Sequence, residues 1–288
     1  MKSLAPLATV LAILFVLWYG FAVWMNSPLQ RDLYHNNDNT TFTAGDLVHD
    51  SLNMERPKLP APHQIAAELY RLIIATAPDS KRSLVYHAAI TLEETLIGFA
   101  IGGALGIGLA VLIVFAQPLE RSLMPWIVAS QTVPIIALAP MIVVILNQFD
   151  IGGMTPKAAI AAYLSFFPVT VGMVKGLRSP DPLQLDLMRT YSATPMQTLI
   201  KLRAPSSLPF FFASLQIGAA AALVGAIVAE VTKSEDGGLG ARLLAGSYYG
   251  QTVQIWAALF TAAALSGALV GVIGLIARLT LRKAAFPT

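Results

Sequence analysis

The sequence predicts an all-α, polytopic membrane protein with about six transmembrane helices. Of its 288 residues, 56% are hydrophobic and only 12% are charged, about half of the roughly 25% that is usual in soluble domains. Apolar runs of about 20 residues recur along the chain, and each is long enough to cross a bilayer as a helix. The sequence contains no cysteine, which excludes disulfides and cysteine-ligated metal sites.

The predicted spans are almost free of ionisable residues, because burying a charge in lipid is costly. Asp, Glu, Lys and Arg are absent from four windows: residues 95–119, 122–149, 158–174 and 204–229. Spans are expected at residues 4–25, 90–115, 123–147, 157–175, 208–230 and 253–280. We interpret residues 1–25 as a transmembrane anchor, since the apolar run is longer than that of a signal peptide and no small-x-small cleavage site follows it.

Basic residues in the short loops predict the orientation. If both termini are cytoplasmic, the inner side holds ten basic residues: Lys2, Arg121, Lys175, Arg178, Arg189, Lys201, Arg203, Arg278, Arg282 and Lys283. The short outer loops then hold only three: Lys157, Lys233 and Arg242. This asymmetry is the positive-inside pattern, so we expect cytoplasmic N- and C-termini.

The long segment at residues 26–88 is expected outside the membrane. Its first part, residues 26–58, is rich in polar residues and predicts irregular structure. Residues 62–77 predict a short amphipathic helix, because Ile65, Leu72 and their apolar neighbours recur at helical spacing. Such a helix suits the outer membrane surface or a cap over the bundle.

Residues 178–207 interrupt the apolar pattern with a helical hairpin. Asp181 is a good N-cap and a proline follows it, as at the start of many helices. Thr194 and Gln197 have the spacing of a second capping box, and Pro205 is expected to interrupt the second helix. The charge count places the hairpin on the cytoplasmic side. An amphipathic hairpin there suits docking into a groove on a partner; the alternatives are a solvated loop or a helix resting on lipid headgroups.

The hairpin resembles the cytoplasmic EAA loop of permease subunits of binding-protein-dependent ABC importers. That pattern is Glu-Ala-Ala, three residues, Gly, nine residues and Ile-x-Leu-Pro. The corresponding positions hold Asp186-Leu187-Met188, Ser192 and Leu202-Arg203-Ala204-Pro205. The spacing is kept, while the identities depart from the pattern. If the glycine serves a positive φ, serine there costs about 1 kcal/mol.

Further fragments resemble the nitrate/taurine/alkanesulfonate branch of these permeases. In chain order they are Leu59-Pro60-Ala61-Pro62, His87, Thr91, Gly98-Phe99, Pro134, Ala137, Pro140, Phe166-Phe167-Pro168 and Gly237-Gly238-Leu239-Gly240. The resemblance extends over nearly the whole chain beyond residue 55.

The resemblance implies a type I ABC importer permease fold in the bacterial inner membrane, with a five-helix core at residues 89–288. It implies a homodimer that forms the pathway for a small solute, a periplasmic solute-binding protein and a cytoplasmic ATPase dimer. ATP and Mg would be bound by the ATPase, and this chain would have no catalytic residue, cofactor, metal or nucleic-acid partner. The absence of a G-x-x-x-x-G-K-[ST] motif agrees. The implied ATPase-coupling residues are Asp186, Leu187, Met188, Arg189, Tyr191, Ser192, Ala193, Thr194, Pro195 and Pro205.

Isolated polar residues and prolines near the spans are candidates for the substrate pathway or a gate. They are Glu94, Gln131, Pro134, Pro140, Gln216 and Glu230. Each has a structural alternative: Glu94, like Glu93, at the water interface, Glu230 as an interfacial anchor, the glutamines in interhelical hydrogen bonds, and the prolines as bends. Small residues repeat every four positions at Gly98, Gly102 and Gly106 and again at Gly267 and Gly271, which suits helix packing or a subunit interface.

Two other functions remain as alternatives. An ATPase-independent secondary transporter or channel would commonly show an internal repeat, and none is evident. An intramembrane enzyme would need a buried catalytic constellation, against which the charge-free spans argue. With no basic residue evident at membrane depth, the sequence favours a neutral or aromatic small solute.

Overall fold

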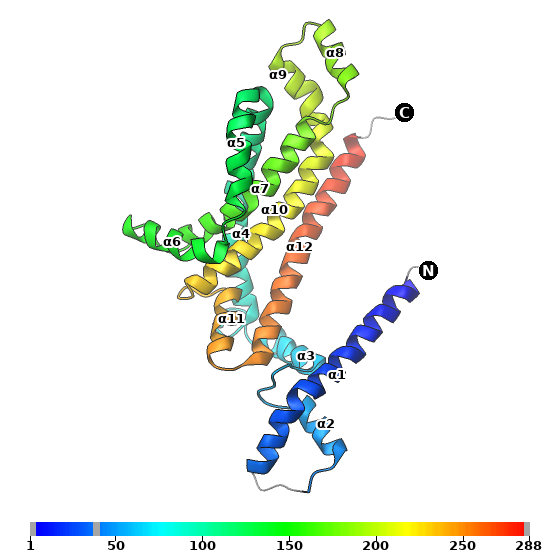
Figure 1. Cartoon of the computed structure of the whole chain (residues 1–288), viewed down its shortest axis with the longest axis vertical. Helices are drawn as coiled ribbons and strands as arrows, with labels where there is room; N and C mark the ends of the chain where they lie inside the picture. Colours follow the sequence, from blue (N-terminus) through cyan, green and yellow to red (C-terminus); the bar gives the residue numbers. More distant parts are fainter. Residues whose placement is uncertain (1–3, 37–40, 285–288) are drawn as a thin grey trace. The chain divides into compact units, whose positions relative to one another are not determined.

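The computed structural model describes residues 4–36 and 41–284, which form two compact units (Figure 1). One unit combines the chain up to His87 with Arg242–Thr261, and the other combines Ala88–Ala241 with the residues from Ala262 onward. Within the described ranges every regular element is helical, which confirms the predicted all-α class. Lys2, used in the orientation argument, lies outside the described residues.

The first unit contains α1 (Leu4–Asn36), α2 (Ala44–Leu52), α3 (Pro62–Tyr70) with a π-helical turn at Arg71–Ala75, most of α11 (Leu239–Tyr248) and the start of α12 (Thr252–Ala284). The second contains most of α4 (Leu84–Phe115), α5 (Gln117–Ser130), α6 (Ile135–Gln148), α7 (Thr155–Leu177), α8 (Pro182–Thr190), α9 (Pro195–Thr198), a π-helical turn at Leu199–Arg203, α10 (Ala204–Thr232) and the rest of α12.

The number of apolar spans agrees with the prediction, but one span is broken. Five stretches among the described residues are long and apolar enough to cross a membrane: Pro6–Asn36, Leu84–Phe115, Thr155–Leu177, Pro195–Thr232 and Thr252–Arg282. The remaining expected span, the third at residues 123–147, is instead the pair Pro118–Ser130 and Ile135–Gln148, bent by 100° at the break.

Much of the described part of residues 26–58 is helical, where the polar composition predicted irregular structure; only the short stretches on either side of α2 follow that prediction. Helix α1 continues to Asn36, and α2 begins at a capping box in which Thr43 and Asp46 satisfy each other's backbone amides. The buried side chain of Asn26 ties α1 to the segment around and after α2, because its amide donates to the carbonyls of Ser51 and Leu59 and accepts from the amide of Leu59. Polar residues therefore tie this helical segment together rather than solvating a loop.

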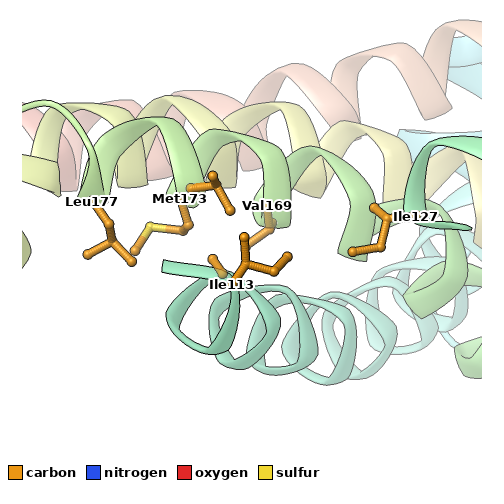
Figure 2. Close-up of a cluster of buried hydrophobic side chains, with 7 residues drawn as sticks. Ile113, Ile127, Val169, Met173 and Leu177 are labelled. Carbon is orange, nitrogen blue, oxygen red and sulfur yellow. The ribbon is translucent and has the colours of Figure 1, made fainter. Parts of the chain in front are cut away.

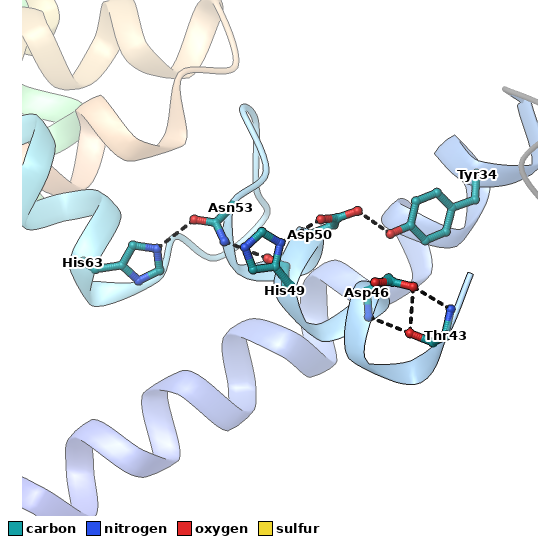
Figure 3. Close-up of polar contacts among 7 residues, drawn as sticks. All are labelled: Tyr34, Thr43, Asp46, His49, Asp50, Asn53 and His63. Atoms are coloured by element: carbon teal, nitrogen blue, oxygen red, sulfur yellow. Dashed lines mark hydrogen bonds and ion pairs between the residues drawn. The ribbon is translucent and has the colours of Figure 1, made fainter. Parts of the chain in front are cut away.

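A chain of polar contacts links α1, α2 and α3 (Figure 3). The Tyr34 hydroxyl donates to Asp50 Oδ2 over 2.5 Å, and His49 Nδ1 lies 2.9 Å from Asp50 Oδ1. The hydrogen bond from Tyr34, and to a smaller extent the contact with His49, hold the pKa of the Asp50 carboxyl below its usual value. His63 Nε2 lies 3.3 Å from Asn53 Oδ1. The predicted amphipathic helix is present as α3, with Ile65 buried.

Close packing of small residues holds the helices of the second unit together. A methyl group at Gly98, Gly102 or Gly106 on α4 would collide with α7, so this repeat serves packing within the chain. Figure 2 shows the neighbouring apolar cluster, in which Ile113 of α4 and Ile127 of α5 face α7. On α12, by contrast, a methyl group at Gly267 or Gly271 would meet no atom within 4 Å.

Candidate functional site

The predicted hairpin is formed by α8 and α9 and projects beyond the ends of α7 and α10 (Figure 1). Asp181 Oδ1 accepts from the amide of Leu183 over 2.8 Å at the start of α8. At the start of α9, Thr194 Oγ1 accepts from the amide of Gln197, whose side chain accepts from the amide of Thr194. Both predicted caps are confirmed, so each helix begins where its sequence signal lies.

The turn between the two helices requires a left-handed residue, and Ser192 supplies it with φ +50°. The amide of Ser192 donates to the carbonyl of Arg189 over 2.9 Å, and the amide of Ala193 donates to that of Met188 over 3.0 Å. This pair of bonds is a Schellman motif, which favours glycine at the left-handed position. The serine therefore keeps the geometry for which the glycine of the EAA pattern is suited.

Pro205 does not interrupt the second helix as expected. The chain stays helical from Pro195 to Thr232, with a wide π-turn at Leu199–Arg203 in which the amide of Ala204 bonds to the carbonyl of Leu199. Pro205 has no amide hydrogen to donate, and the change of hydrogen-bond register just before it accommodates this loss. The hairpin is consequently continuous with the membrane span of α10.

An apolar stripe on the hairpin has no cover from the described part of the chain. It consists of Leu183 (77% exposed), Leu187 (55%) and Tyr191 (76%) at successive turns of α8, with Met196 (56%) and Ile200 (62%) on the second helix. Asp186 borders the stripe and forms an ion pair of 2.8 Å with Arg189. We call these five apolar side chains the hairpin stripe.

The other predicted coupling residues lie outside the hairpin stripe. Met188 is half-buried, whereas Arg189, Ala193 and Pro195 line a groove beside the end of α4. Pro205 lies in the first turn of α10.

Two arginine contacts fix the hairpin to the bundle. Arg178, just after α7, holds both carboxylate oxygens of Glu120 on α5 at 2.6 and 2.7 Å, and this contact raises the pKa of the Arg178 guanidinium. Arg203 donates to the carbonyl of Leu177, the last residue of α7, over 2.8 Å. These contacts join the base of the hairpin to the ends of α5 and α7.

The candidate gate residues Gln131 and Pro134 lie at the sharp bend between α5 and α6, and both are exposed. Pro134 cannot donate to the carbonyl of Ser130, its normal helical acceptor. The hydroxyl of Tyr163 on α7 donates to that carbonyl instead. Tyr163 was not identified from the sequence, because only the fold brings it to the break. Pro140 lies inside α6 without breaking it.

Gln216 lines a groove of about 600 Å³ between α10 and α12. Gly271 and Gly274 form part of its wall, and Arg278 contributes to the same groove. The glutamine is half-buried, and no hydrogen bond to it is evident from the described residues. This leaves its amide available to the groove.

Glu94 belongs to a buried polar cluster rather than to the water interface. Its Oε1 lies 2.9 Å from Lys157 Nζ, and the two side chains are 2% and 0% exposed. Asp236 Oδ2 lies 3.5 Å from the same ammonium. Lys157 was counted with the outer loops, at the start of the span expected at residues 157–175; it lies buried in the first turn of α7, and these two carboxylates neutralise its charge. Glu93, its sequence neighbour, is exposed.

Glu230 is fully buried in the same region and accepts hydrogen bonds from two other elements. Thr91 Oγ1 on α4 donates to its Oε1 over 2.6 Å, and the amide of Gly240 donates to its Oε2 over 2.6 Å. The Gly237-Gly238 turn has positive φ at both residues, which lets the backbone approach the carboxylate closely. Glu230 thus joins α4, α10 and the start of α11.

An all-helical bundle with apolar spans and a capped, projecting hairpin agrees with the fold expected of the permease subunit of an ABC importer. Residues 102–284 match the family described as binding-protein-dependent transport system inner membrane component. The chain belongs to this family, within its nitrate/taurine/alkanesulfonate-type branch. It is therefore a multi-pass transport subunit rather than an ATPase-independent transporter or channel.

Relatives with known names support this assignment. The formylaminopyrimidine transport permease protein ThiX of Halalkalibacterium halodurans is 35% identical over 179 residues, covering 62% of this chain and 67% of the relative. The riboflavin transport system permease protein RibX of Chloroflexus aurantiacus is 30% identical over 224 residues, covering 78% and 80%. The aliphatic sulfonates transport permease protein SsuC of Bacillus subtilis is 25% identical over 199 residues, covering 69% and 68%.

A solved structure supports the fold. The methionine ABC transporter MetNI, in inward-facing conformations, matches with a TM-score of 0.58 and 20% identity over 70% of this chain and 96% of the matched chain.

Proposed function

We propose that this permease imports a small neutral nitrogen heterocycle, driven by a cytoplasmic ATPase dimer that docks on the hairpin at residues 181–205. A periplasmic binding protein delivers the solute to a pathway formed by two copies of the chain. The protein lies in the bacterial inner membrane with both termini in the cytoplasm. The ATPase binds ATP and Mg and hydrolyses the ATP, since this sequence contains no phosphate-loop motif.

The hairpin stripe carries the proposal for coupling. Large apolar side chains with more than half of their surface exposed favour burial against a partner, because removing apolar surface from water is favourable. The caps at Asp181 and Thr194 hold the two helices in a fixed shape, as an insert for a groove requires. The links through Arg178 and Arg203 then transmit a displacement of the hairpin to α5 and α7.

The proposal for the solute rests on the charges near the candidate pathway. Lys157 is a basic residue in the first turn of the α7 span, but its ammonium is fully buried and already paired with Glu94 and Asp236. Gln131 and Gln216 offer uncharged amides, which match the donor and acceptor edges of a heterocycle. Three relatives are 30% identical or more; two of them are named for formylaminopyrimidine and riboflavin transport, and the name of the third gives no solute.

Coupling is tested in proteoliposomes that contain the permease with its ATPase and binding protein. Asp186→Lys and Ser192→Ile are expected to abolish transport while the complex still assembles. Leu187→Asp should weaken ATPase docking by roughly 2 kcal/mol, as for a central interface residue. Glu235→Lys, an equal charge change in an exposed loop away from the hairpin, is the control. Normal transport in the first two variants would overturn the proposal for coupling.

The solute is tested by calorimetry on the partner binding protein with formylaminopyrimidine, riboflavin, an alkanesulfonate and nitrate. We expect a heterocycle to bind. Tight binding of nitrate or the sulfonate, with no heterocycle bound, would overturn this assignment and leave the coupling proposal intact.

A further inference from the structure

A groove of about 260 Å³ separates the hairpin from the end of α4. Val114 and Phe115 form one wall, and they are the last residues of the apolar span Leu84–Phe115. Leu185 and Arg189 of α8 form the opposite wall, and Arg203 lines the groove as well. The groove therefore lies where a membrane span ends and cationic side chains begin.

The groove and the hairpin stripe occupy different faces of α8. Leu185 and Arg189, four residues apart, line the groove, whereas Leu183, Leu187 and Tyr191 carry the exposed stripe. An offset of two residues turns a helical position by about 200°. A partner docked on the stripe would therefore leave the groove on the opposite side, toward the membrane span of α4.

The charges in the groove favour an anion. Among the residues that the structure describes, no carboxylate lines it, while two guanidinium groups do. Arg203 is held in place by its bond to the Leu177 carbonyl, and its other N–H groups remain to serve a ligand. Arg189 is 81% exposed at its side chain and shares its charge with Asp186 at 2.8 Å. The guanidinium of a single arginine can bind two phosphate oxygens through two parallel hydrogen bonds.

From these observations we infer that the groove binds the phosphate of an anionic phospholipid, with Arg189 and Arg203 on the headgroup and the apolar wall at Val114 and Phe115 against the start of an acyl chain. A mixed groove of this kind suits a lipid better than a free anion, because the apolar side chains of Val114 and Phe115 would otherwise stay in contact with water. Basic pockets beside membrane spans favour such headgroups. The inference does not depend on which partner docks on the hairpin stripe.

The test uses the full-length chain purified in detergent, with native mass spectrometry of bound phosphatidylglycerol and of phosphatidylcholine with the same acyl chains. Phosphatidylglycerol is expected to bind more tightly. Arg189→Gln and Arg203→Gln should each weaken its binding about fivefold, the effect of one cation near a headgroup. Lys201→Gln is the matched control, because Lys201 is exposed, lies on the same hairpin and is not part of the groove wall.

Three results would overturn the inference. The first is equal binding of the two lipids, and the second is a loss with Lys201→Gln as large as with Arg189→Gln, which would indicate diffuse surface charge. The third is displacement of phosphatidylglycerol by inorganic phosphate or by the assembled ATPase, which would assign the groove to a free anion or to the partner. Arg189→Gln keeps the test decisive if Arg203→Gln fails to fold, because the Arg189 side chain is largely exposed.

Discussion

The ammonium of Lys157 lies 2.9 Å from the carboxylate of Glu94, and both side chains are buried where α4 meets α7. Glu94 has one further carboxylate oxygen, buried and without a hydrogen-bond partner among the described atoms. Asp236, 46% exposed, reaches the same ammonium from the loop after α10. One cation thus joins α4, α7 and the loop after α10, in addition to the close packing of α4 against α7.

Breaking this ion pair should cost more than removing it altogether. Lys157→Met leaves the buried Glu94 carboxylate unpaired and should destabilise the protein by about 3–5 kcal/mol, whereas the double variant Glu94→Leu with Lys157→Met should lose much less. Denaturation of the detergent-solubilised chain measures both, with Glu93→Leu, an exposed neighbour, as the control. If the double variant lost as much stability as Glu94→Leu and Lys157→Met together, the two residues would not act as a pair.

The two glycine repeats should respond to alanine with opposite signs. A methyl group at Gly102 would collide with Ser165 and Ala162 of α7, so Gly102→Ala should lower the thermal unfolding temperature. A methyl group at Gly267 would meet no neighbour, and Gly267→Ala should raise stability by about 0.5–1 kcal/mol through helix propensity. Similar destabilisation at both sites would contradict this. Loss of dimerisation with Gly267→Ala alone would identify the second repeat as a subunit interface.

Local signals in the sequence were sufficient for the spans and for the hairpin. Asp181 and Thr194 begin their helices because the capping side chain, the proline after it and the residue that closes the capping box lie within four positions of one another. The apolar runs likewise predict spans from local sequence, since a helix forms its backbone hydrogen bonds within the span itself.

Contacts between distant residues could not be read in this way. Lys157 and Glu94 are 63 residues apart, so the sequence alone does not show that the lysine is buried against a carboxylate of α4. The polar segment after α1 looked irregular because the partners of Asn26, at Ser51 and Leu59, follow more than 20 residues later. Prolines alone did not predict where helices break. Pro205 was expected to interrupt its helix but is accommodated by a wide turn, whereas Pro134 lies at the sharp bend.

The bend at Pro134 should depend on Tyr163. Its hydroxyl supplies the hydrogen bond to Ser130 that proline cannot, so Tyr163→Phe should leave that carbonyl without its protein donor and destabilise the chain by about 1–2 kcal/mol. Spin labels on α5 and α6 should report a broader distance distribution in the variant by electron resonance. Phe149→Leu, an exposed residue at the end of α6, is the control. An unchanged distribution in Tyr163→Phe would show that Pro134 alone sets the bend.

The contact between Tyr34 and Asp50 should make part of the stability pH-dependent. The tyrosine hydrogen bond favours the charged carboxyl and lowers its pKa, so its contribution is complete above the unfolded-state pKa of about 4. The contribution is lost as the pH falls through the lowered folded-state pKa. Tyr34→Phe should therefore lower the thermal unfolding temperature at pH 7 and have less effect at pH 3. A difference that stays constant with pH would argue against this assignment.

Ser192 should make the hairpin less stable than glycine would at the same position. Its φ of +50° lies in the left-handed region, where a side chain costs about 1 kcal/mol relative to glycine. Ser192→Gly should therefore protect the amides of α8 from hydrogen exchange and leave transport intact, while Ser192→Val should expose them and impair transport, because a β-branched residue fits this region poorly. Ala193→Gly serves as the control, as it adds flexibility beside the turn without relieving a left-handed residue. Faster exchange in Ser192→Gly than in the unmodified chain would mean that the serine side chain stabilises the turn.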